Sequence, residues 1–267
     1  MQFTPLSDIK CFLLDLDGTF FLGNRLIEGS ARFLDVLKTQ HKGFMFLTNN
    51  SSQHRRMYAE KLYRMGVSIP EERIFTSGEA TAFFIKKLKP GARLYVVGTP
   101  ALQEEFQSHG FILTEDSPEI AVLGFDTTLT YARLWKLCDL VRSGLPYIAT
   151  HPDINCPTET GFMPDIGAMI AFVKASTGKE PDQVIGKPNG AIVDAVSEKL
   201  NLPINQLAMV GDRLYTDIAL GASSGITTIL VFSGETRPED LNGSPYQPTY
   251  TFNNLGGLAD WLTNASS

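Results

Sequence analysis

Short apolar runs alternate with amphipathic segments along most of the chain. Such runs occupy residues 11–14, 43–48, 206–210 and 227–232. Between the first two, Phe33 and Leu37 recur at helical spacing within residues 30–38. Continuous apolar runs of this length are typical of parallel strands that are buried on both faces. The alternation at both ends of the chain therefore predicts one doubly wound, Rossmann-like α/β domain with a parallel sheet.

The middle of the chain repeats this alternation on a smaller scale. It predicts strands at residues 94–97, 120–125 and 147–150. The helix expected between the last two carries Leu134 and Leu137 on one face. We therefore expect residues 1–80 and 182–267 to form a discontinuous core domain, with residues 81–181 as an inserted, smaller α/β domain.

Length and charge narrow the range of functions. A chain of 267 residues is about the size at which a second domain becomes common. With 23 basic and 29 acidic residues and no basic run, neither nucleic acid nor a membrane is an expected partner. No segment is apolar for the roughly 20 residues that span a bilayer, and Asp8 and Lys10 interrupt any signal-peptide core. We therefore expect a cytoplasmic protein that acts on a small molecule.

Two acidic residues follow the first predicted strand. Asp15 and Asp17 lie where that strand ends, and open α/β sheets bind their ligands at this edge. A carboxylate can attack phosphorus, and a second carboxyl nearby can protonate a leaving group and then activate water. A turn in which aspartate caps backbone amides would show the same spacing, so the pair alone leaves both interpretations open.

A second pair of acids follows a later strand. Asp212 comes just after residues 206–210, and Asp217 lies five residues further on. Carboxylates about 4 Å apart repel by about 4 kcal/mol at an effective dielectric constant near 20, so a cluster must bind a cation or take up protons. Oxygen ligands favour Mg²⁺ over zinc or copper. Asp217 would also be stabilised in the first turn of a helix without any metal.

Two further segments suit a phosphoryl group. Thr48 and Asn49 end the second strand and offer a hydroxyl, an amide and backbone N–H groups. Lys187, between Gly186 and Pro188, could neutralise a phosphate. An ordinary helix cap at Thr48 and Asn49, and a solvated surface lysine at 187, remain alternatives at this point.

In order along the chain, these residues resemble the four motifs of the haloacid dehalogenase (HAD) superfamily. The motifs are DLDGT at Asp15, Thr48-Asn49, Gly186-Lys187-Pro188 and GDRLYTD at Asp212. The insert lies between the second and third motifs, as in the C2-capped branch. The segments LTNNSS and ATHPD are similar to the NagD-like, 4-nitrophenylphosphatase-like subfamily (subclass IIA). One departure is His151, where many relatives carry Asn.

The resemblance implies a HAD core with a C2-type cap and a Mg²⁺-dependent phosphomonoesterase that works through an aspartyl phosphate. Asp15 would be the nucleophile and Asp17 the general acid and base. Mg²⁺ would be held by Asp15, the backbone carbonyl of Asp17 and Asp212, with Asp217 orienting this shell. Thr48, Asn49 and Lys187 would hold the phosphoryl oxygens.

Substrate selection is expected from the insert, because the core motifs account only for the phosphoryl group. Residues 150–167 form a long polar segment, predicted as a loop, in which His151, Asp153 and Asn155 could address hydroxyl groups. A polar lid favours sugar or polyol phosphates, with 4-nitrophenyl phosphate as an activated substrate. A nucleotide monophosphatase, a phosphotransferase of the same superfamily and a receiver-like phospho-acceptor are the alternatives. A homo-oligomer formed through the cap stays open.

Overall fold

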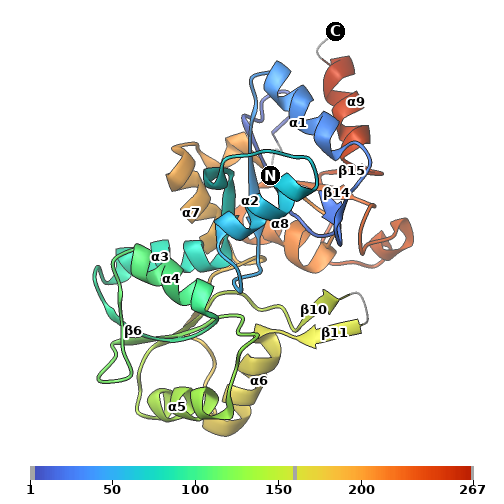
Figure 1. Ribbon diagram of the computed structural model, residues 1–267. Coiled ribbons are helices and arrows are strands. Elements are labelled where there is room, and N and C mark those ends of the chain that lie inside the picture. Colours follow the sequence, from blue (N-terminus) through green and yellow to red (C-terminus); the bar gives the residue numbers. More distant parts are fainter. Residues whose placement is uncertain (1–3, 159–160, 266–267) are drawn as a thin grey trace. The chain divides into compact units, whose positions relative to one another are not determined.

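The computed structural model describes residues 4–158 and 161–265, and Figure 1 shows its elements in chain order. The chain divides into two compact units. The first contains the described parts of Met1–Thr48, Tyr58–Phe75 and Lys187–Ser267, and the second contains Asn49–Met57 and the described parts of Thr76–Gly186. The first and last parts of the chain thus belong to one unit, and the second unit also takes in the segment that starts at Asn49.

A six-stranded sheet forms the centre of the first unit, in the order β15-β14-β13-β1-β4-β5. Its strands are β1 (Cys11–Leu14), β4 (Gly43–Thr48), β5 (Ile74–Thr76), β13 (Leu207–Gly211), β14 (Thr227–Val231) and β15 (Tyr250–Phe252). Strand β1 pairs in parallel with both β4 and β13, so segments about 200 residues apart are neighbours. The predicted α/β fold with a parallel sheet is confirmed.

The central strand β1 is buried on both faces. Phe12 and Leu14 of β1 join one hydrophobic core, while Leu13 points to the opposite face and is equally buried. This double burial explains why β1 is apolar without interruption. A short hairpin of β2 (Phe21–Leu22) and β3 (Arg25–Leu26) follows β1 and returns the chain toward its first helix.

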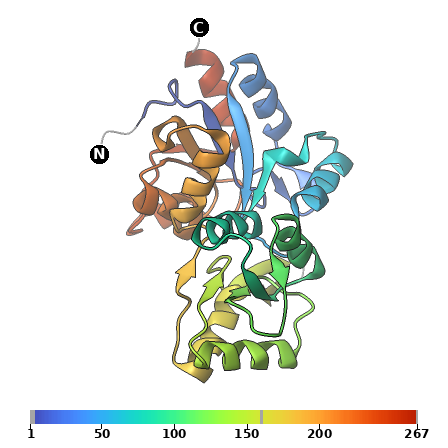
Figure 2. The ribbon, with the colours of Figure 1, turned by 90° about the vertical axis from the view of Figure 1, so that its left-hand side faces the viewer.

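Helices α1 and α9 lie side by side on one face of the sheet (Figures 1 and 2). The helices of this unit are α1 (Ser30–Thr39), most of α2 (Arg55–Arg64), α7 (Ala191–Leu200), α8 (Ala219–Ser224) and α9 (Leu255–Ala265). The ring of Phe33 on α1 packs edge-on against Phe12, with centroids 5.7 Å apart. At the start of the two helices, a Cβ on Gly29 would lie 2.3 Å from the Cα of Gly256. Glycine at both positions therefore permits the close approach.

The second unit is a smaller α/β layer structure around a five-stranded sheet in the order β12-β9-β8-β6-β7. Its strands are β6 (Arg93–Val97), β7 (Ile112–Leu113), β8 (Ile120–Leu123), β9 (Tyr147–Ala149) and β12 (Gln183–Val184); its helices are α3 (Ser77–Leu88), α4 (Pro100–Ser108), α5 (Tyr131–Arg142) and α6 (Ile166–Thr177). Helices α5 and α6 cover one face through a shared core, and α3 and α4 lie on the other (Figure 2). The alternation predicted for the insert is present.

The segment predicted as a polar loop at residues 150–167 contains a hairpin. Strands β10 (Asn155–Thr158) and β11 (Gly161–Pro164) pair antiparallel, with Asn155 opposite Pro164. Prolines in both strands hid this hairpin, because proline is a weak strand former. A two-stranded sheet tolerates proline where the missing N–H would point away from the partner strand. The expectation of a loop throughout is therefore wrong for these residues.

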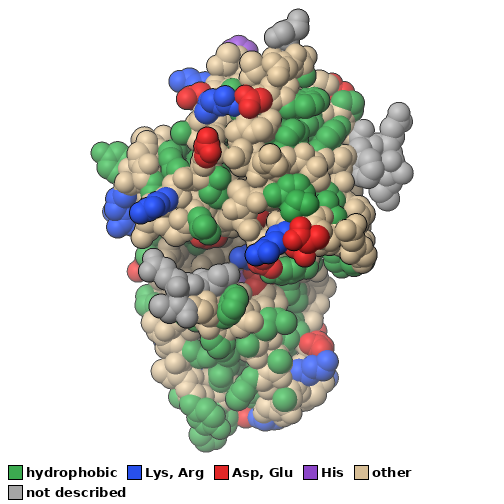
Figure 3. Space-filling view, turned by 90° about the vertical axis from the view of Figure 1, so that its right-hand side faces the viewer, with side chains coloured by type: hydrophobic (Ala, Val, Ile, Leu, Met, Phe, Trp, Pro, Cys, Tyr) green, Lys and Arg blue, Asp and Glu red, His purple; other side chains and the backbone are tan. Residues whose placement is uncertain are grey.

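The surface carries charges of both signs. On the face shown in Figure 3, acidic and basic side chains lie intermixed. Exposed pairs such as Lys89 with Glu119, 2.7 Å apart, illustrate this pattern. Within residues 4–158 and 161–265, no helix has the combination of length and apolar character that crossing a bilayer requires.

Candidate active site

Asp15 stands at the carboxyl end of β1. Its backbone N–H donates to the carbonyl of Val210 in β13 at 2.9 Å, which fixes the residue to the sheet. Its carboxylate is mostly buried, and Oδ1 accepts a short hydrogen bond from Nζ of Lys187. The structure thus places Asp15 where the sequence predicts a ligand site, and the ammonium group of Lys187 contacts its carboxylate.

Lys187 is buried, with 2% of its surface exposed, so it is not a solvated surface lysine. Its Nζ also donates to Oδ1 of Asp217 at 2.7 Å and to the carbonyl of Leu47 at 3.2 Å. Burial alone lowers the pKa of Lys187, but the charges of Asp15 and Asp217 outweigh this effect and raise the pKa above its usual value. The ammonium group therefore stays charged and neutralises part of the acidic cluster.

Asp212 follows β13 and is held by its neighbours. Oδ2 accepts from the backbone N–H of Glu235 at 2.7 Å, and Oδ1 accepts from the hydroxyl of Thr19 at 3.2 Å. A Cβ on Gly18 would lie 2.4 Å from Oδ2, and one on Gly234 would lie 2.0 Å from the same atom. These two glycines therefore leave the space that the carboxylate occupies.

Asp217 lies in a single π-helical turn, Leu214–Ile218, rather than in the first turn of a regular helix, as considered from the sequence. Its Oδ2 accepts from the backbone N–H of Arg213 at 3.1 Å, and its Oδ1 accepts from Lys187. A Cβ on Gly211 would lie 2.1 Å from Cγ of Asp217. With both oxygens bonded to N–H groups, this fully buried carboxylate is better suited to orienting Lys187 than to binding a metal on its own.

The three carboxylates together could hold a metal ion. One oxygen each from Asp15, Asp212 and Asp217 lies within 4.8 Å of the others. Burial and the nearby acids raise the pKa of Asp15 to about 8, although Lys187 acts in the opposite direction. Burial and Asp217 likewise raise the pKa of Asp212 to about 6. A cation would relieve this repulsion, and a set of oxygen donors suits a hard divalent ion.

Asp17 is exposed, unlike the other acids predicted for the catalytic site. The surrounding protein limits hydration of its carboxyl and raises its pKa, while Lys61, Arg213 and Lys187 act in the opposite direction. Its backbone forms a bridge with Phe21, which turns the chain back after β1. A carboxyl with a raised pKa is suited to give up a proton during a reaction.

Thr48 and Asn49 are both buried, the first at the end of β4 in the first unit and the second in the second unit. No helix starts at Asn49, because α2 begins only at Arg55, so these residues are not an ordinary helix cap. Nδ2 of Asn49 donates to Oδ1 of Asp153 at 3.0 Å. The predicted phosphate-binding amide is therefore bonded to a residue predicted to select the substrate.

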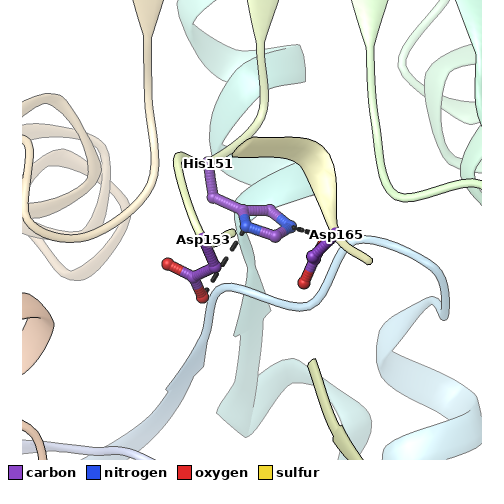
Figure 4. Close-up of side chains that lie close together, drawn as sticks. All are labelled: His151, Asp153 and Asp165. Carbon is purple, nitrogen blue, oxygen red and sulfur yellow. Dashed lines mark ion pairs between the residues drawn. The ribbon is translucent and has the colours of Figure 1, made fainter. Parts of the chain in front are cut away.

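His151 is fully buried between two carboxylates, as Figure 4 shows. Nδ1 lies 3.7 Å from Oδ2 of Asp153, and Nε2 lies 3.5 Å from Oδ1 of Asp165. Asn155, the third residue predicted to address the substrate, is exposed on β10. The structure thus groups His151 with Asp153 and places the side chain of Asn155 at the surface.

Two further residues join these clusters: Arg213, which the sequence did not single out, and Asp165, which the sequence offers only as one of several polar residues in the 150–167 segment. Arg213 carries an elevated pKa because Asp15 and Asp212 outweigh the lowering effect of burial, and its Nε lies 3.1 Å from Glu235. The position of Arg213 directly after Asp212 in the sequence was the signal that could have placed it near the acidic cluster. Asp165 caps α6 and faces His151. No helix was predicted after Asp165, and no local signal indicated its contact with the histidine.

Comparisons with known proteins agree with this geometry. A family profile described as haloacid dehalogenase-like hydrolase matches residues 12–112, and a HAD-hydrolase-like profile matches residues 184–258. The crystal structure of a 4-nitrophenylphosphatase from Thermotoga maritima superimposes with a TM-score of 0.93 at 50% identity, covering 96% of this chain and 98% of that chain.

Curated relatives cover nearly the whole chain as well. An acid sugar phosphatase of Staphylococcus saprophyticus is 38% identical over 94% of this chain and 96% of its own length. A 5'-nucleotidase of Bacillus subtilis is 33% identical over 96% of this chain and 99% of its own length. The similarity thus extends over both units and not only over the motifs.

Proposed function

Because the chain belongs to the haloacid dehalogenase-like hydrolases, we propose that it is a Mg²⁺-dependent phosphomonoesterase acting on small phosphorylated metabolites. One observation carries the proposal. Asp15, Asp212 and Lys187 meet at the carboxyl ends of β1 and β13, where a nucleophile, a cation site and a fixed positive charge are needed together. The placement of charged groups around the phosphoryl group is the main source of catalysis in phosphoryl transfer.

The metal would be held by the carboxylates of Asp15 and Asp212 and by the backbone carbonyl of Asp17. Asp217 would act indirectly, because it holds Lys187 and the Arg213 N–H. When bound, Mg²⁺ would lower the charge repulsion between the nucleophile and the phosphate dianion. The donors that the structure brings together are all oxygen, which fits this ion.

Thr48, Asn49 and Lys187 would hold the phosphoryl oxygens. The Thr48 hydroxyl and the Asn49 amide supply neutral donors, and the Lys187 ammonium supplies a charged one. Lys187 also fixes Oδ1 of Asp15, which limits the rotation of the attacking carboxylate. Fixed donors of this kind contribute more than mobile ones, because they need no reorganisation during the reaction.

The reaction would proceed in two displacements. A carboxylate oxygen of Asp15 forms a bond to phosphorus while the bond from phosphorus to the substrate oxygen breaks, and Asp17 gives its proton to the departing alcohol. Asp17 then takes a proton from water, whose oxygen attacks the aspartyl phosphate and releases inorganic phosphate. The same carboxyl thus ends in its starting protonation state, and Asp15 is regenerated.

We assign substrate selection to the second unit, as a cap inserted into the catalytic core. The sequence predicts that His151, Asp153 and Asn155 read the substrate, and sugar or polyol phosphates as the preferred class. The similarity to an acid sugar phosphatase supports that class. The expected cytoplasmic location and a homo-oligomer formed through the cap stay predictions.

Metal dependence tests the proposed function directly. EDTA should abolish hydrolysis of 4-nitrophenyl phosphate, and excess Mg²⁺ should restore it. Ca²⁺ should inhibit, because it takes six to eight ligands and would loosen the octahedral arrangement. Release of 4-nitrophenolate measures the rate, and the melting temperature in each buffer controls for unfolding. Full activity in chelator would contradict the proposed metal site.

A nucleotide monophosphatase is the second candidate, favoured by the similarity to a 5'-nucleotidase. We expect the highest kcat/KM in a panel of phosphomonoesters for a sugar or glycerol phosphate, because polar side chains of the cap suit hydroxyl groups. Phosphate release from each compound measures the preference. A nucleoside monophosphate at the top of the ranking would select the second candidate instead.

A further inference from the structure

The amide of Asn49 has a fixed orientation. Its Nδ2 donates to Asp153 at 3.0 Å, and a Cβ on Gly186 would lie 2.7 Å from its Oδ1. The backbone carbonyl of Asn49 accepts a short hydrogen bond from the hydroxyl of Ser77, which holds the main chain at this residue. A primary amide carries two N–H donors on one nitrogen, so a bond to one of them sets the direction of the other. The side chain that donates to Asp153 is therefore held in one rotamer and one flip state.

Asp153 is itself held by its surroundings. While Oδ1 accepts from Asn49, Oδ2 lies 3.7 Å from Nδ1 of His151. The backbone carbonyl of Asp153 accepts from the N–H of Gly167 at 2.7 Å, at the start of α6. A Cβ on Gly167 would lie 2.4 Å from the carbonyl oxygen of Pro152, so this approach requires glycine. The backbone and the carboxylate of Asp153 are thus both held in position.

His151 joins Asp153 to the start of α6. Its other nitrogen, Nε2, lies 3.5 Å from Oδ1 of Asp165, which accepts the N–H of Ile166 at 2.7 Å and so caps the helix. The ring packs edge-on against Phe125, with centroids 6.5 Å apart. Figure 4 shows the imidazole lying between the two carboxylates. A continuous series of contacts therefore runs from the helix cap to the amide of Asn49.

One ligand atom each from His151, Asp153 and Asp165 lies within 4.8 Å of the others, a spacing that a metal ion could also bridge. The directions in which the two carboxylates face the ring favour a different role. A metal binds the lone pair of one ring nitrogen, so its other ligands must converge on a point in front of that nitrogen, about 2 Å away. Here Asp153 faces Nδ1 and Asp165 faces Nε2, on opposite sides of the ring. The ring therefore faces a different carboxylate at each nitrogen, which suits a residue that packs between Asp153 and Asp165 and holds them apart.

We propose that Asp153 is a positioning residue that acts through Asn49: it sets the direction of the phosphate-binding amide, and His151 holds Asp153 in place. The inference rests on the proposed function, in which Asn49 binds the phosphoryl group. It changes the role predicted for His151 and Asp153, because a residue that orients the phosphate site affects every phosphomonoester alike. Selection among leaving groups then belongs to other cap residues, such as Asn155.

A double-mutant cycle tests this role. Asn49→Ala and Asp153→Ala should each lower kcat/KM by about tenfold, and they should do so equally for 4-nitrophenyl phosphate and for the best sugar phosphate. The double variant should also lose about tenfold, rather than the product of about a hundredfold, because Asp153 has no effect once its target is absent. Competitive inhibition by inorganic phosphate should weaken by the same factors, which gives a measurement independent of the leaving group.

Matched variants separate positioning from a general structural effect. Asp139→Ala removes another carboxylate of the same unit, one that pairs with Arg142 at the surface of α5, and it should leave all kinetic constants unchanged. Asp153→Asn keeps an oxygen that accepts from Asn49, so it should lose less activity than Asp153→Ala. Melting temperatures identify variants that fail to fold, and Asp153→Asn keeps the test available if Asp153→Ala is one of them.

Several outcomes would overturn the inference. Multiplied losses in the double variant, or a loss at Asp153 confined to the sugar phosphate, would show that Asp153 contacts the substrate itself. A rise in melting temperature with Zn²⁺ that disappears in His151→Ala would assign a metal site to His151, Asp153 and Asp165 in place of the positioning role. An unaltered enzyme that hydrolyses no phosphomonoester would refute the proposed function instead, so the two failures are distinguishable.

Discussion

Asp15→Asn is expected to abolish turnover, with a loss on the order of 10⁴-fold or more. The amide is nearly the same size as the carboxylate but is a poor nucleophile toward phosphorus. Its oxygen can still accept from Lys187, which now holds Oδ1 of Asp15. We therefore expect the variant to fold and to keep the arrangement around Lys187. Single-turnover and steady-state assays with 4-nitrophenyl phosphate measure the loss.

The control for this prediction is a surface aspartate. Asp139→Asn on α5 makes the same chemical change far from the catalytic cluster in sequence and should leave the rate unchanged. After an acid quench, the unaltered enzyme should carry labelled phosphate and the Asp15 variant should carry none. This difference would agree with the loss of the nucleophile. Residual activity of Asp15→Asn within tenfold of the unaltered enzyme would rule out Asp15 as the nucleophile.

The clustering of Asp15 with Asp212 was predictable because its signals are local. Asp15 follows directly on one apolar run and Asp212 follows another after a single glycine, and parallel strands bring their carboxyl ends to one edge of a sheet. Asp15 and Asp212 are therefore neighbours as soon as β1 pairs with β13. The burial of Lys187 was less predictable, because a single lysine before a turn has no periodic context that distinguishes a buried side chain from an exposed one.

The contacts that could not be predicted join distant segments. Asn49 and Asp153 are 104 residues apart, and no property of either neighbourhood specifies their hydrogen bond. The same holds for Gly234, whose missing side chain makes room for Asp212. Such contacts depend on the register and packing of whole elements. They are also the contacts that change the expected role of Asp153 from reading the substrate to orienting the phosphate site.

Asp17→Asn is expected to cause the second large loss of activity, and the size of this loss should depend on the leaving group. The variant keeps the backbone carbonyl proposed for Mg²⁺ but can neither protonate the departing oxygen nor accept a proton from water. General acid and base catalysis contributes about 10²–10⁴-fold, so hydrolysis of a sugar phosphate should fall by that range. The raised pKa of Asp17 supports this role, because it lets the carboxyl hold its proton until the alcohol leaves.

For 4-nitrophenyl phosphate the loss should be smaller, since 4-nitrophenolate leaves without a proton. Activation of water in the second displacement still needs a base, so some loss should remain on both substrates, and a burst of 4-nitrophenolate should precede slow turnover. Both substrates carry the same phosphoryl group, so any change in its binding affects both losses equally. The ratio of the loss for the sugar phosphate to the loss for 4-nitrophenyl phosphate therefore measures the general acid role of Asp17. Equal losses for the activated ester and the alkyl ester would contradict leaving-group protonation by Asp17.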